Sequence, residues 1–377
     1  MNTGRSVRRA GQALGTKARA VADVVTNPAL VSNVRVKLNV LTHRTFALPI
    51  LLYAPTSRCN SRCVSCDWWR TDGATDLGRH EVAMLCKELR GLRTKLVVFT
   101  GGEPLVREDV FDVADLFRAQ GVALHLLTSG LALEKHAAAV ATRFAGVTIS
   151  LDGHTPELYR RVRGVDGLAA VERGVRRLRE LAPHLPVRAR STLHRLNFRA
   201  LPDLIDKAAA MGLAEISFLA ADATSDSFGR RTAGSLPVVA PPPQALLLDD
   251  AETTEFETVI EKALASHASA FRDGRVAEQG DKLRRLATYY RAHVRGDSSL
   301  FPGVRCNAPW ASAVIEADGT LRPCFFQPSV GNVRARGLKA LLDDEMVRFR
   351  RGLDVGRDPT CQRCVCSLRV GLRSRLG

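Results

Sequence analysis

Short apolar runs alternate with amphipathic stretches of helical period between Leu48 and Leu219, and this alternation constrains the fold most. Runs of this kind are typical of buried strands, and the intervening pattern is typical of helices packed on a sheet. We expect strands at Pro49–Ala54, Lys95–Thr100, Val122–Thr128, Gly146–Leu151, Val187–Leu193 and Glu215–Leu219. We expect helices at Arg79–Leu89, Asp109–Ala119, Glu134–Arg143, Gly167–Leu181 and Ala200–Ala210. Repeated strand–helix units predict an α/β fold with a parallel sheet, whose functional groups lie at the carboxyl ends of the strands.

The alternation stops near Asp222. Residues 225–250 are rich in turn formers and include a run of three prolines, which indicates a loop or linker. Helical stretches follow at about 251–270 and 276–294, before a cysteine-rich end. We therefore expect an N-terminal segment at 1–46, the α/β core at 47–224, a linker and helical segment at 225–302 and a cysteine-rich domain at 303–377.

The composition describes a folded basic protein. The 377 residues carry 55 Lys and Arg against 39 Asp and Glu, and 45% are hydrophobic, which argues against a disordered basic chain. No apolar run approaches the roughly 18 to 20 residues that span a bilayer, and the N-terminus lacks the apolar region of a secretory signal. We expect a cytoplasmic protein, in which the nine cysteines are metal ligands or reactive groups rather than disulfides.

The N-terminal segment, 1–46, holds eight basic residues against one acidic residue, Asp23. Its apolar residues recur at spacings of three and four: Val7, Ala10, Leu14, Ala18, Val21 and Val25. Such a helix is suited to peripheral contact with an anionic membrane, or to packing on the domain behind it. Nucleic acid is a weaker hypothesis, because no aromatic residue for base stacking precedes Phe46.

Three cysteines follow the first expected strand in the pattern Cys59-x3-Cys63-x2-Cys66. Three thiolates can hold three irons of a four-iron cluster and leave the fourth iron open to a ligand. A structural zinc site is the alternative, although it needs a fourth ligand and the nearest histidine is His80.

Polar turns follow the next three strands. The second strand ends in Gly101-Gly102-Glu103-Pro104, where the glycines allow close approach of the backbone to a ligand and the carboxylate suits an ammonium group. Ser129 follows the third strand, and Ser150 and Asp152 end the fourth with groups that suit a ribose. Each turn alone is ordinary loop chemistry, but their order along the chain is informative.

These features together resemble the radical S-adenosylmethionine (SAM) superfamily over about residues 48–219. The resemblance implies a partial (β/α)6 TIM-like barrel and a [4Fe-4S] cluster held by the three thiolates, whose open iron binds the methionine part of SAM. It implies that the reduced cluster cleaves SAM to a 5′-deoxyadenosyl radical, which abstracts a hydrogen atom from a substrate. The cofactor contacts it implies are Gly101, Gly102, Glu103, Pro104, Ser129, Ser150 and Asp152. The residue before the third cysteine is commonly aromatic in this family, but here it is Ser65, so we expect Trp68 or Trp69 to pack against the adenine.

A second group of cysteines lies near the C-terminus. An Asp318-Gly319 turn predicts a hairpin that brings Cys306 and Cys324 toward each other, and Cys361 and Cys364 follow at Cys-x2-Cys spacing. This arrangement is similar to the SPASM or twitch extension of some radical SAM enzymes, which binds auxiliary clusters. We expect one auxiliary [4Fe-4S] cluster on these four cysteines, with Cys366 as the alternative fourth ligand. Zinc is the alternative metal, because the spacing of sulfurs does not select one.

The resemblance favours an enzyme that receives electrons from a low-potential donor such as flavodoxin or ferredoxin. We expect a small molecule, lipid or glycan as substrate, because the N-terminal segment is short for a peptide-recognition domain; a peptide-modifying enzyme is the alternative. Asp222 and His194, after the last two strands, are weak candidates for substrate binding or proton transfer. A basic metal-binding module that contacts nucleic acid is the non-enzymatic alternative, and the polar turns speak against it.

Overall fold

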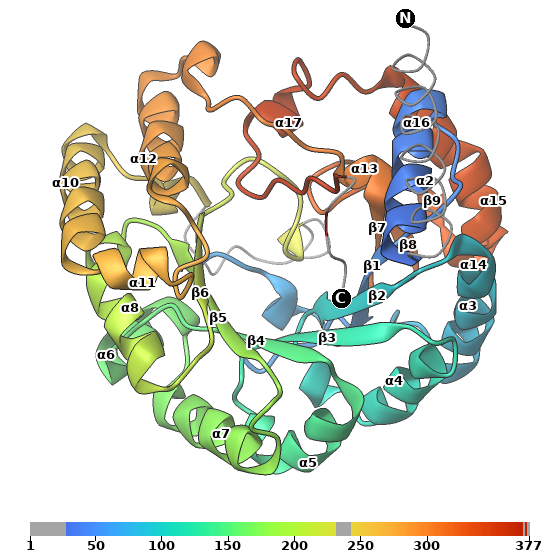
Figure 1. Cartoon of the computed structure of the whole chain (residues 1–377), viewed down its shortest axis with the longest axis horizontal. Helices are drawn as coiled ribbons and strands as arrows, with labels where there is room; N and C mark the ends of the chain where they lie inside the picture. The colour runs from blue at the N-terminus through green and yellow to red at the C-terminus, as the bar shows by residue number, and fades with distance from the viewer. Residues whose placement is uncertain (1–27, 231–242, 372–373, 375–377) are drawn as a thin grey trace, which may run out of the picture.

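The computed structural model describes residues 28–230, 243–371 and 374. Six parallel strands form an open arc: β1 (Ile50–Thr56), β2 (Leu96–Gly101), β3 (Ala123–Thr128), β4 (Gly146–Ser150), β5 (Val187–Leu193) and β6 (Ile216–Ala220). They pair in sequence order, which confirms the partial barrel expected from the alternating pattern (Figure 1).

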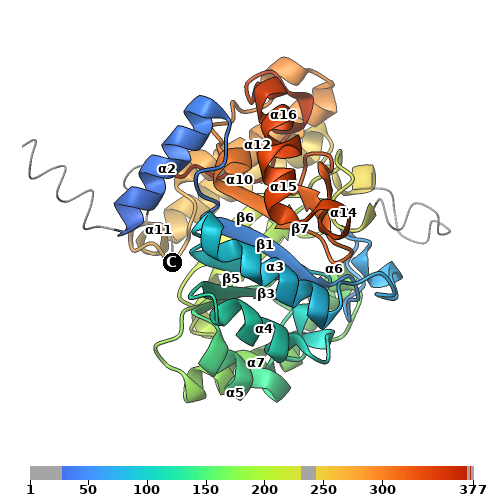
Figure 2. The same cartoon turned by 90° about the vertical axis from the view of Figure 1, so that its right-hand side faces the viewer.

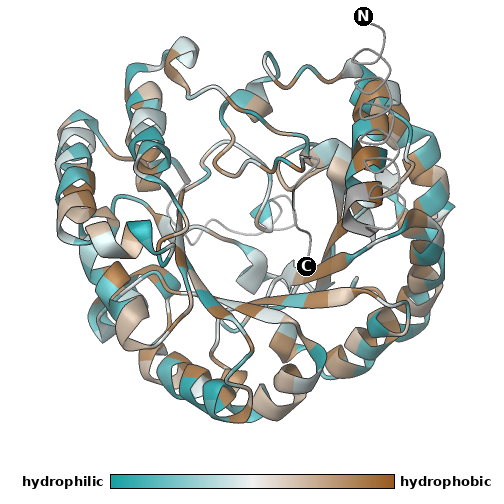
Figure 3. Ribbon diagram, viewed as in Figure 1, coloured by the Kyte–Doolittle hydropathy of each residue, from teal (hydrophilic) through white to brown (hydrophobic). Residues whose placement is uncertain are grey.

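Helices cover the outer face of the arc: α3 (Arg79–Leu92), α4 (Val110–Arg118), α5 (Leu133–Arg143), α6 (Pro156–Arg163), α7 (Leu168–Leu181) and α8 (Leu201–Ala210). Their hydrophobic faces lie toward the sheet (Figure 3). Tyr53, Phe99 and Phe117 pack there with ring centroids 5.0 to 5.6 Å apart. Because strand side chains alternate, the other face of the strands is left to line the inside of the barrel.

Helix α6 was absent from the helices expected from the sequence. The Thr155 hydroxyl accepts a hydrogen bond from the Leu158 N–H, Pro156 occupies the first turn, and Gly164 ends the helix in a left-handed conformation. These are ordinary start and stop signals, but the helix is short, and its Arg160, Arg161 and Arg163 weaken the apolar pattern.

The C-terminal region extends the barrel sheet. Strand β7 (Ser312–Ile315) pairs in parallel with β1, and β8 (Thr320–Arg322) and β9 (Gly331–Asn332) continue the sheet antiparallel, giving the order β6-β5-β4-β3-β2-β1-β7-β8-β9. The hairpin expected around the Asp318-Gly319 turn is confirmed. Its attachment to β1 was not expected, and it makes the cysteine-rich region part of the barrel wall.

The remaining helices of the described residues come before β1 or after β6. They are α2 (Pro28–Thr42), α10 (Asp250–Ser266), α11 (Ala268–Arg272), α12 (Gly280–Arg295), α13 (Ala308–Ala311), α14 (Val333–Arg336), α15 (Leu338–Asp343), α16 (Glu345–Gly352) and α17 (Pro359–Gln362). The C-terminal segment lies across the gap between α12 and α2 (Figure 1). Helix α15 begins on α3, where the Glu88 carboxylate accepts hydrogen bonds from the Leu338 and Lys339 N–H groups (Figure 2).

The amphipathic pattern from Val7 to Val25 lies outside the described residues, so membrane contact there stays a sequence prediction. Within the described part of the chain, no helix is both long and apolar enough to cross a membrane.

Candidate cofactor and metal sites

A cavity of about 200 Å³ lies at the carboxyl ends of the barrel strands. The three thiols of the loop after β1 open into it, together with the turns after β2, β3 and β4. Its lining includes Cys59, Cys63, Cys66, Trp68, Gly101, Gly102, Glu103, Ser129, Ser150 and Asp152. The structure therefore brings together the cluster and cofactor residues expected from the sequence, apart from Pro104, which is buried at the start of a short 3-10 helix, η2 (Pro104–Val106).

The cysteine loop is fastened to the turn after β2. The N–H groups of Gly102 and Glu103 donate to the carbonyls of Thr56 and Arg58 at 3.0 and 2.8 Å. A Cβ atom at Gly102 would lie 2.1 Å from the Arg58 carbonyl oxygen, so this glycine is required for contact between two segments of the chain. Gly102 therefore positions the cysteine loop, a role beyond the close approach of backbone to ligand that the sequence predicts.

Glu103 joins two of the turns. Its carboxylate is buried and accepts from the Thr128 hydroxyl at 2.7 Å, the Ser129 N–H at 2.6 Å and the Leu105 N–H at 3.1 Å. A carboxylate offers about four acceptor positions, so one remains for a ligand donor in the cavity. The side chain thus aligns β2 with β3 and keeps the capacity to bind an ammonium group.

Arg163, at the end of α6, was missed by the sequence analysis. Its guanidinium pairs with the Asp152 carboxylate at 3.1 Å, and Asp152 also accepts from the Thr192 N–H at 2.8 Å. Burial by itself lowers the pKa of Arg163, but Cys63, when it is a thiolate, and Asp152 raise it above the ordinary value. A permanent cation therefore stands beside the thiols, where it balances the negative charge of a thiolate cluster.

Burial raises the pKa of all three thiols in this loop, and that of Cys59 reaches about 11. Without metal they are therefore protonated thiols, and metal binding must displace their protons.

A second cavity, of about 270 Å³, lies under the C-terminal segment. All five C-terminal cysteines line it: Cys306, Cys324, Cys361, Cys364 and Cys366. Three of the sulfurs accept hydrogen bonds, from the Ala308 N–H to Cys306, from the Gln327 amide to Cys361 and from the Cys366 N–H to Cys364. Donors of this kind stabilise thiolates and tune the potential of a cluster.

Among the described residues, neither cysteine group is arranged to hold a single metal ion. Within the described ranges, no three Cys, His, Asp or Glu side chains stand close enough together to hold one metal ion. Zinc needs tetrahedral sulfurs at about 2.3 Å, and hence about 3.8 Å from one another. In a four-iron cluster each iron takes one protein thiolate, so the sulfurs stand farther apart.

The two weak catalytic candidates lie outside the cofactor cavity. Asp222 turns its carboxylate into its own loop, where it accepts hydrogen bonds from Thr224 and Ser225 and pairs with Arg230. His194 is fully buried, its Nδ1 accepts from the Leu196 N–H, and burial lowers its pKa to about 4. Each candidate follows a strand but is turned inward by loop hydrogen bonds, which strand position alone does not reveal.

Comparison with known proteins agrees with this arrangement. The radical SAM superfamily model matches residues 53–218, and the model of an iron–sulfur cluster-binding domain, SPASM, matches residues 306–365. The chain contains a radical SAM domain at residues 53–218. Its cofactors are SAM and a [4Fe-4S] cluster, and its C-terminal domain is of the SPASM type, which binds auxiliary iron–sulfur clusters.

Similar proteins differ in what they act on. A probable GTP 3′,8-cyclase of Thermococcus kodakarensis is 34% identical over 164 residues, 42% of this chain and 52% of that protein. A PqqA peptide cyclase of Rhodopseudomonas palustris is 32% identical over 173 residues, 44% of this chain and 45% of that protein. The chain thus spans about half the length of these curated relatives.

Among solved structures, Streptococcus suis SuiB bound to SAM matches with a TM-score of 0.61 and 14% identity, covering 89% of this chain and 76% of that chain. At this identity the likeness concerns the fold.

Proposed function

We propose that Cys59, Cys63 and Cys66 hold the [4Fe-4S] cluster that cleaves SAM, and that the protein abstracts a hydrogen atom from an organic substrate. The observation that carries the proposal is the shared cavity: the three thiols and the polar turns after β2, β3 and β4 line the same space. When bound and reduced by one electron from a low-potential donor such as flavodoxin or ferredoxin, the cluster and SAM together supply methionine and a 5′-deoxyadenosyl radical.

The chain's own residues orient the cofactor. Glu103 accepts from the amino group of SAM through its remaining acceptor position, and Ser129 and Ser150 offer hydroxyls along the cavity. The Asp152–Arg163 pair fixes the end of β4 against α6 and places a positive charge near the thiols. These roles follow from donor and acceptor capacity at the cavity wall.

For the second site we propose one auxiliary [4Fe-4S] cluster on Cys306, Cys324, Cys361 and Cys364. Cys366 is the alternative fourth ligand, and its backbone N–H already donates to the Cys364 sulfur at 3.3 Å. The cluster would take part in electron transfer or anchor the substrate.

A third cavity, of about 490 Å³, is the location that we propose for the substrate. It is bounded by β6, α12 and the segments at 302–305 and 364–367. Arg190 lines both this cavity and the cofactor cavity, and Cys364 and Cys366 line both this cavity and the auxiliary site. A molecule bound here would lie between the two cysteine groups.

The substrate class is tested by separating candidates by size. The sequence favoured a small molecule, lipid or glycan, whereas similarity to the PqqA peptide cyclase favours a peptide. Fractions of a cell extract below and above about 1 kDa would be tested for stimulation of 5′-deoxyadenosine formation, with products found by mass spectrometry. Stimulation confined to the larger, protease-sensitive fraction would overturn the small-molecule preference.

Cofactor cleavage is the test of the function itself. Anaerobically reconstituted, dithionite-reduced protein should convert SAM to 5′-deoxyadenosine, and Cys59→Ala, Cys63→Ala and Cys66→Ala should each abolish this, because each removes one cluster ligand. Cys86→Ala is the matched control, since Cys86 is a buried thiol of α3 outside both cysteine groups. Turnover that persists in all three loop variants would refute the assignment.

A further inference from the structure

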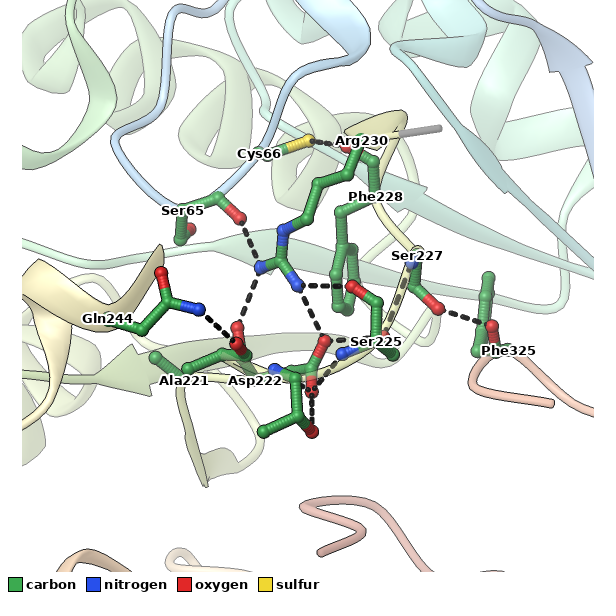
Figure 4. Close-up of polar contacts among 12 residues, drawn as sticks. Ser65, Cys66, Ala221, Asp222, Ser225, Ser227, Phe228, Arg230, Gln244 and Phe325 are labelled. Carbon is green, nitrogen blue, oxygen red and sulfur yellow. Dashed lines mark hydrogen bonds and ion pairs between the residues drawn. The ribbon is translucent and has the colours of Figure 1, made fainter. Parts of the chain in front are cut away.

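The loop after β6, residues 222–230, lies between the two cysteine groups, and we call it the clasp. On one side it contacts the cysteine loop after β1, and on the other it contacts Phe325, the residue after Cys324 (Figure 4). The sequence predicts a linker from residue 225 onward, so most of the clasp is unexpected.

Phe228 occupies the tip of the clasp in an unusual conformation. Its φ is +60°, a left-handed region that bulky side chains rarely adopt. The following residue is glycine for a steric reason, because a Cβ at Gly229 would lie 2.6 Å from the Trp68 nitrogen. The Phe228 carbonyl accepts from the Asp67 N–H at 2.8 Å and from the Cys66 thiol at 3.4 Å. The first bond does not depend on the thiol proton, which iron binding would release. Backbone strain that is held in place in this way is typical of functional positions.

A buried ion pair closes the clasp. Arg230 donates to the Asp222 carboxylate at 2.7 Å and to the Asp222 carbonyl at 2.6 Å, and the two side chains are 11% and 3% exposed. The same guanidinium donates to the Ser65 carbonyl at 3.3 Å and lies 5.5 Å from the Phe228 ring centroid. Arg230 therefore connects both ends of the clasp to the cysteine loop.

The other side of the clasp packs on the auxiliary region. The Phe228 and Phe325 rings stack with centroids 6.4 Å apart and planes at 14°, and Phe326 meets Phe228 edge-on at 6.1 Å. The Ser227 hydroxyl donates to the Phe325 carbonyl. The position of the Phe228 ring is thus set from both cysteine groups.

The lining of the cofactor cavity combines polar and aromatic side chains. Glu103 and Ser129 form a polar wall, whereas Phe228 and Trp68 supply the aromatic rings. Ser65, between Cys63 and Cys66, also lines the cavity and contributes only a small side chain. A ligand with a zwitterionic end and a flat heteroaromatic base matches this polarity, with the base on the aromatic side.

We propose that Phe228 is the wall against which the adenine of SAM stacks, and that the clasp, through Arg230 and Asp222, holds the ring in that position. The proposal rests on the proposed function. It assigns the adenine contact to a residue outside the cysteine loop, whereas the sequence pointed to Trp68 or Trp69. It also makes the position of that wall depend on Phe325, next to the auxiliary ligand Cys324.

Equilibrium binding tests this assignment without turnover. Titration calorimetry on the anaerobically reconstituted protein would use two probes, S-adenosylhomocysteine and methionine, which share the amino acid end and differ in adenine. Phe228→Leu should weaken S-adenosylhomocysteine binding at least about fivefold and leave methionine binding within about twofold, because base stacking alone is lost. Phe228→Tyr should restore affinity, and Phe111→Leu, a half-buried aromatic on α4, is the matched control.

Substitutions of Arg230 test whether the clasp positions the Phe228 ring. Arg230→Gln should weaken S-adenosylhomocysteine more than methionine, and Arg230→Lys should restore part of that affinity because it keeps the charge opposite Asp222. Wild-type affinity for S-adenosylhomocysteine in Phe228→Leu, or an equal loss for both probes, would overturn the proposal. Wild-type protein that binds neither probe and does not cleave SAM would instead refute the proposed function.

Discussion

Gly102 lies where the turn after β2 contacts the cysteine loop. The sequence marked it as part of a glycine pair, but its partner, the Arg58 carbonyl, became visible only in three dimensions. Arg163 and Phe228 carried no comparable signal, because an arginine on a short helix and a phenylalanine in a serine-rich loop are ordinary in sequence. Asp222 and His194 show the converse, since both follow strands and both are turned inward by local hydrogen bonds.

A methyl group at Gly102 should displace the cysteine loop. Gly102→Ala is expected to reduce cluster incorporation and SAM cleavage by at least about tenfold, because the clash is with backbone that cannot rotate away. Gly91→Ala, on the exposed side of α3 with no atom within 4 Å of the new Cβ, should instead be neutral or stabilise the fold by about 0.5 to 1 kcal/mol. Iron and 5′-deoxyadenosine assays on both variants check this, and equal behaviour would contradict it.

Removing the cation beside the thiols should destabilise the barrel. Arg163→Met leaves the buried Asp152 carboxylate without its charged partner, at an expected cost of about 3 to 5 kcal/mol in the free energy of unfolding. Urea unfolding of the metal-free protein measures it. Arg161→Met, at an exposed position of the same helix, is the control and should change little. If Arg163→Met lowers the free energy of unfolding by less than about 1 kcal/mol, the Asp152–Arg163 ion pair does not stabilise the barrel.

At the scale of elements, Arg334 on α14 ties the C-terminal hairpin to the barrel. Its guanidinium pairs with Glu81 on α3 at 2.6 and 3.1 Å and donates to the carbonyls of Thr75, Asp76 and Asp318. The six strands and most helices were predictable because their periodicity is local. The attachment of the hairpin to β1 was not, because pairing between strands distant in sequence depends on tertiary contacts.

Arg334→Gln should lower the free energy of unfolding by about 1 kcal/mol at neutral pH, a modest amount because the pair is more than one-third exposed. The hydrogen bond from Arg334, with help from the Gly78 N–H, lowers the pKa of Glu81 from 4.5 to about 2. A carboxyl group whose pKa is lower in the folded protein stabilises the fold at pH values above its unfolded pKa. The difference in the free energy of unfolding between wild type and Arg334→Gln should therefore shrink as the pH falls from about 4.5 toward 2. Urea unfolding at a series of pH values measures this difference, and Arg357→Gln, at an exposed ion pair, is the control. A difference in the free energy of unfolding that does not depend on pH would contradict the prediction.

At the scale of the whole molecule, a nine-stranded sheet of the described residues connects the regions that hold the two cysteine groups. Strand β1 joins the two regions, because it pairs with β2 of the radical SAM core on one side and with β7 of the SPASM region on the other. The clasp joins the same two regions at the level of the cavities. We therefore expect the two metal sites to have separate ligands, while the sheet and the clasp fix the position of one site relative to the other.

The iron content of cysteine variants tests this account most directly. Anaerobically reconstituted wild-type protein should hold about eight irons per chain, and the triple Cys59/Cys63/Cys66→Ala variant should keep about half and lose SAM cleavage. The quadruple Cys306/Cys324/Cys361/Cys364→Ala variant should also keep about half, in the cluster that cleaves SAM. A triple variant that is free of iron but holds one zinc would make the C-terminal site structural zinc and contradict the account.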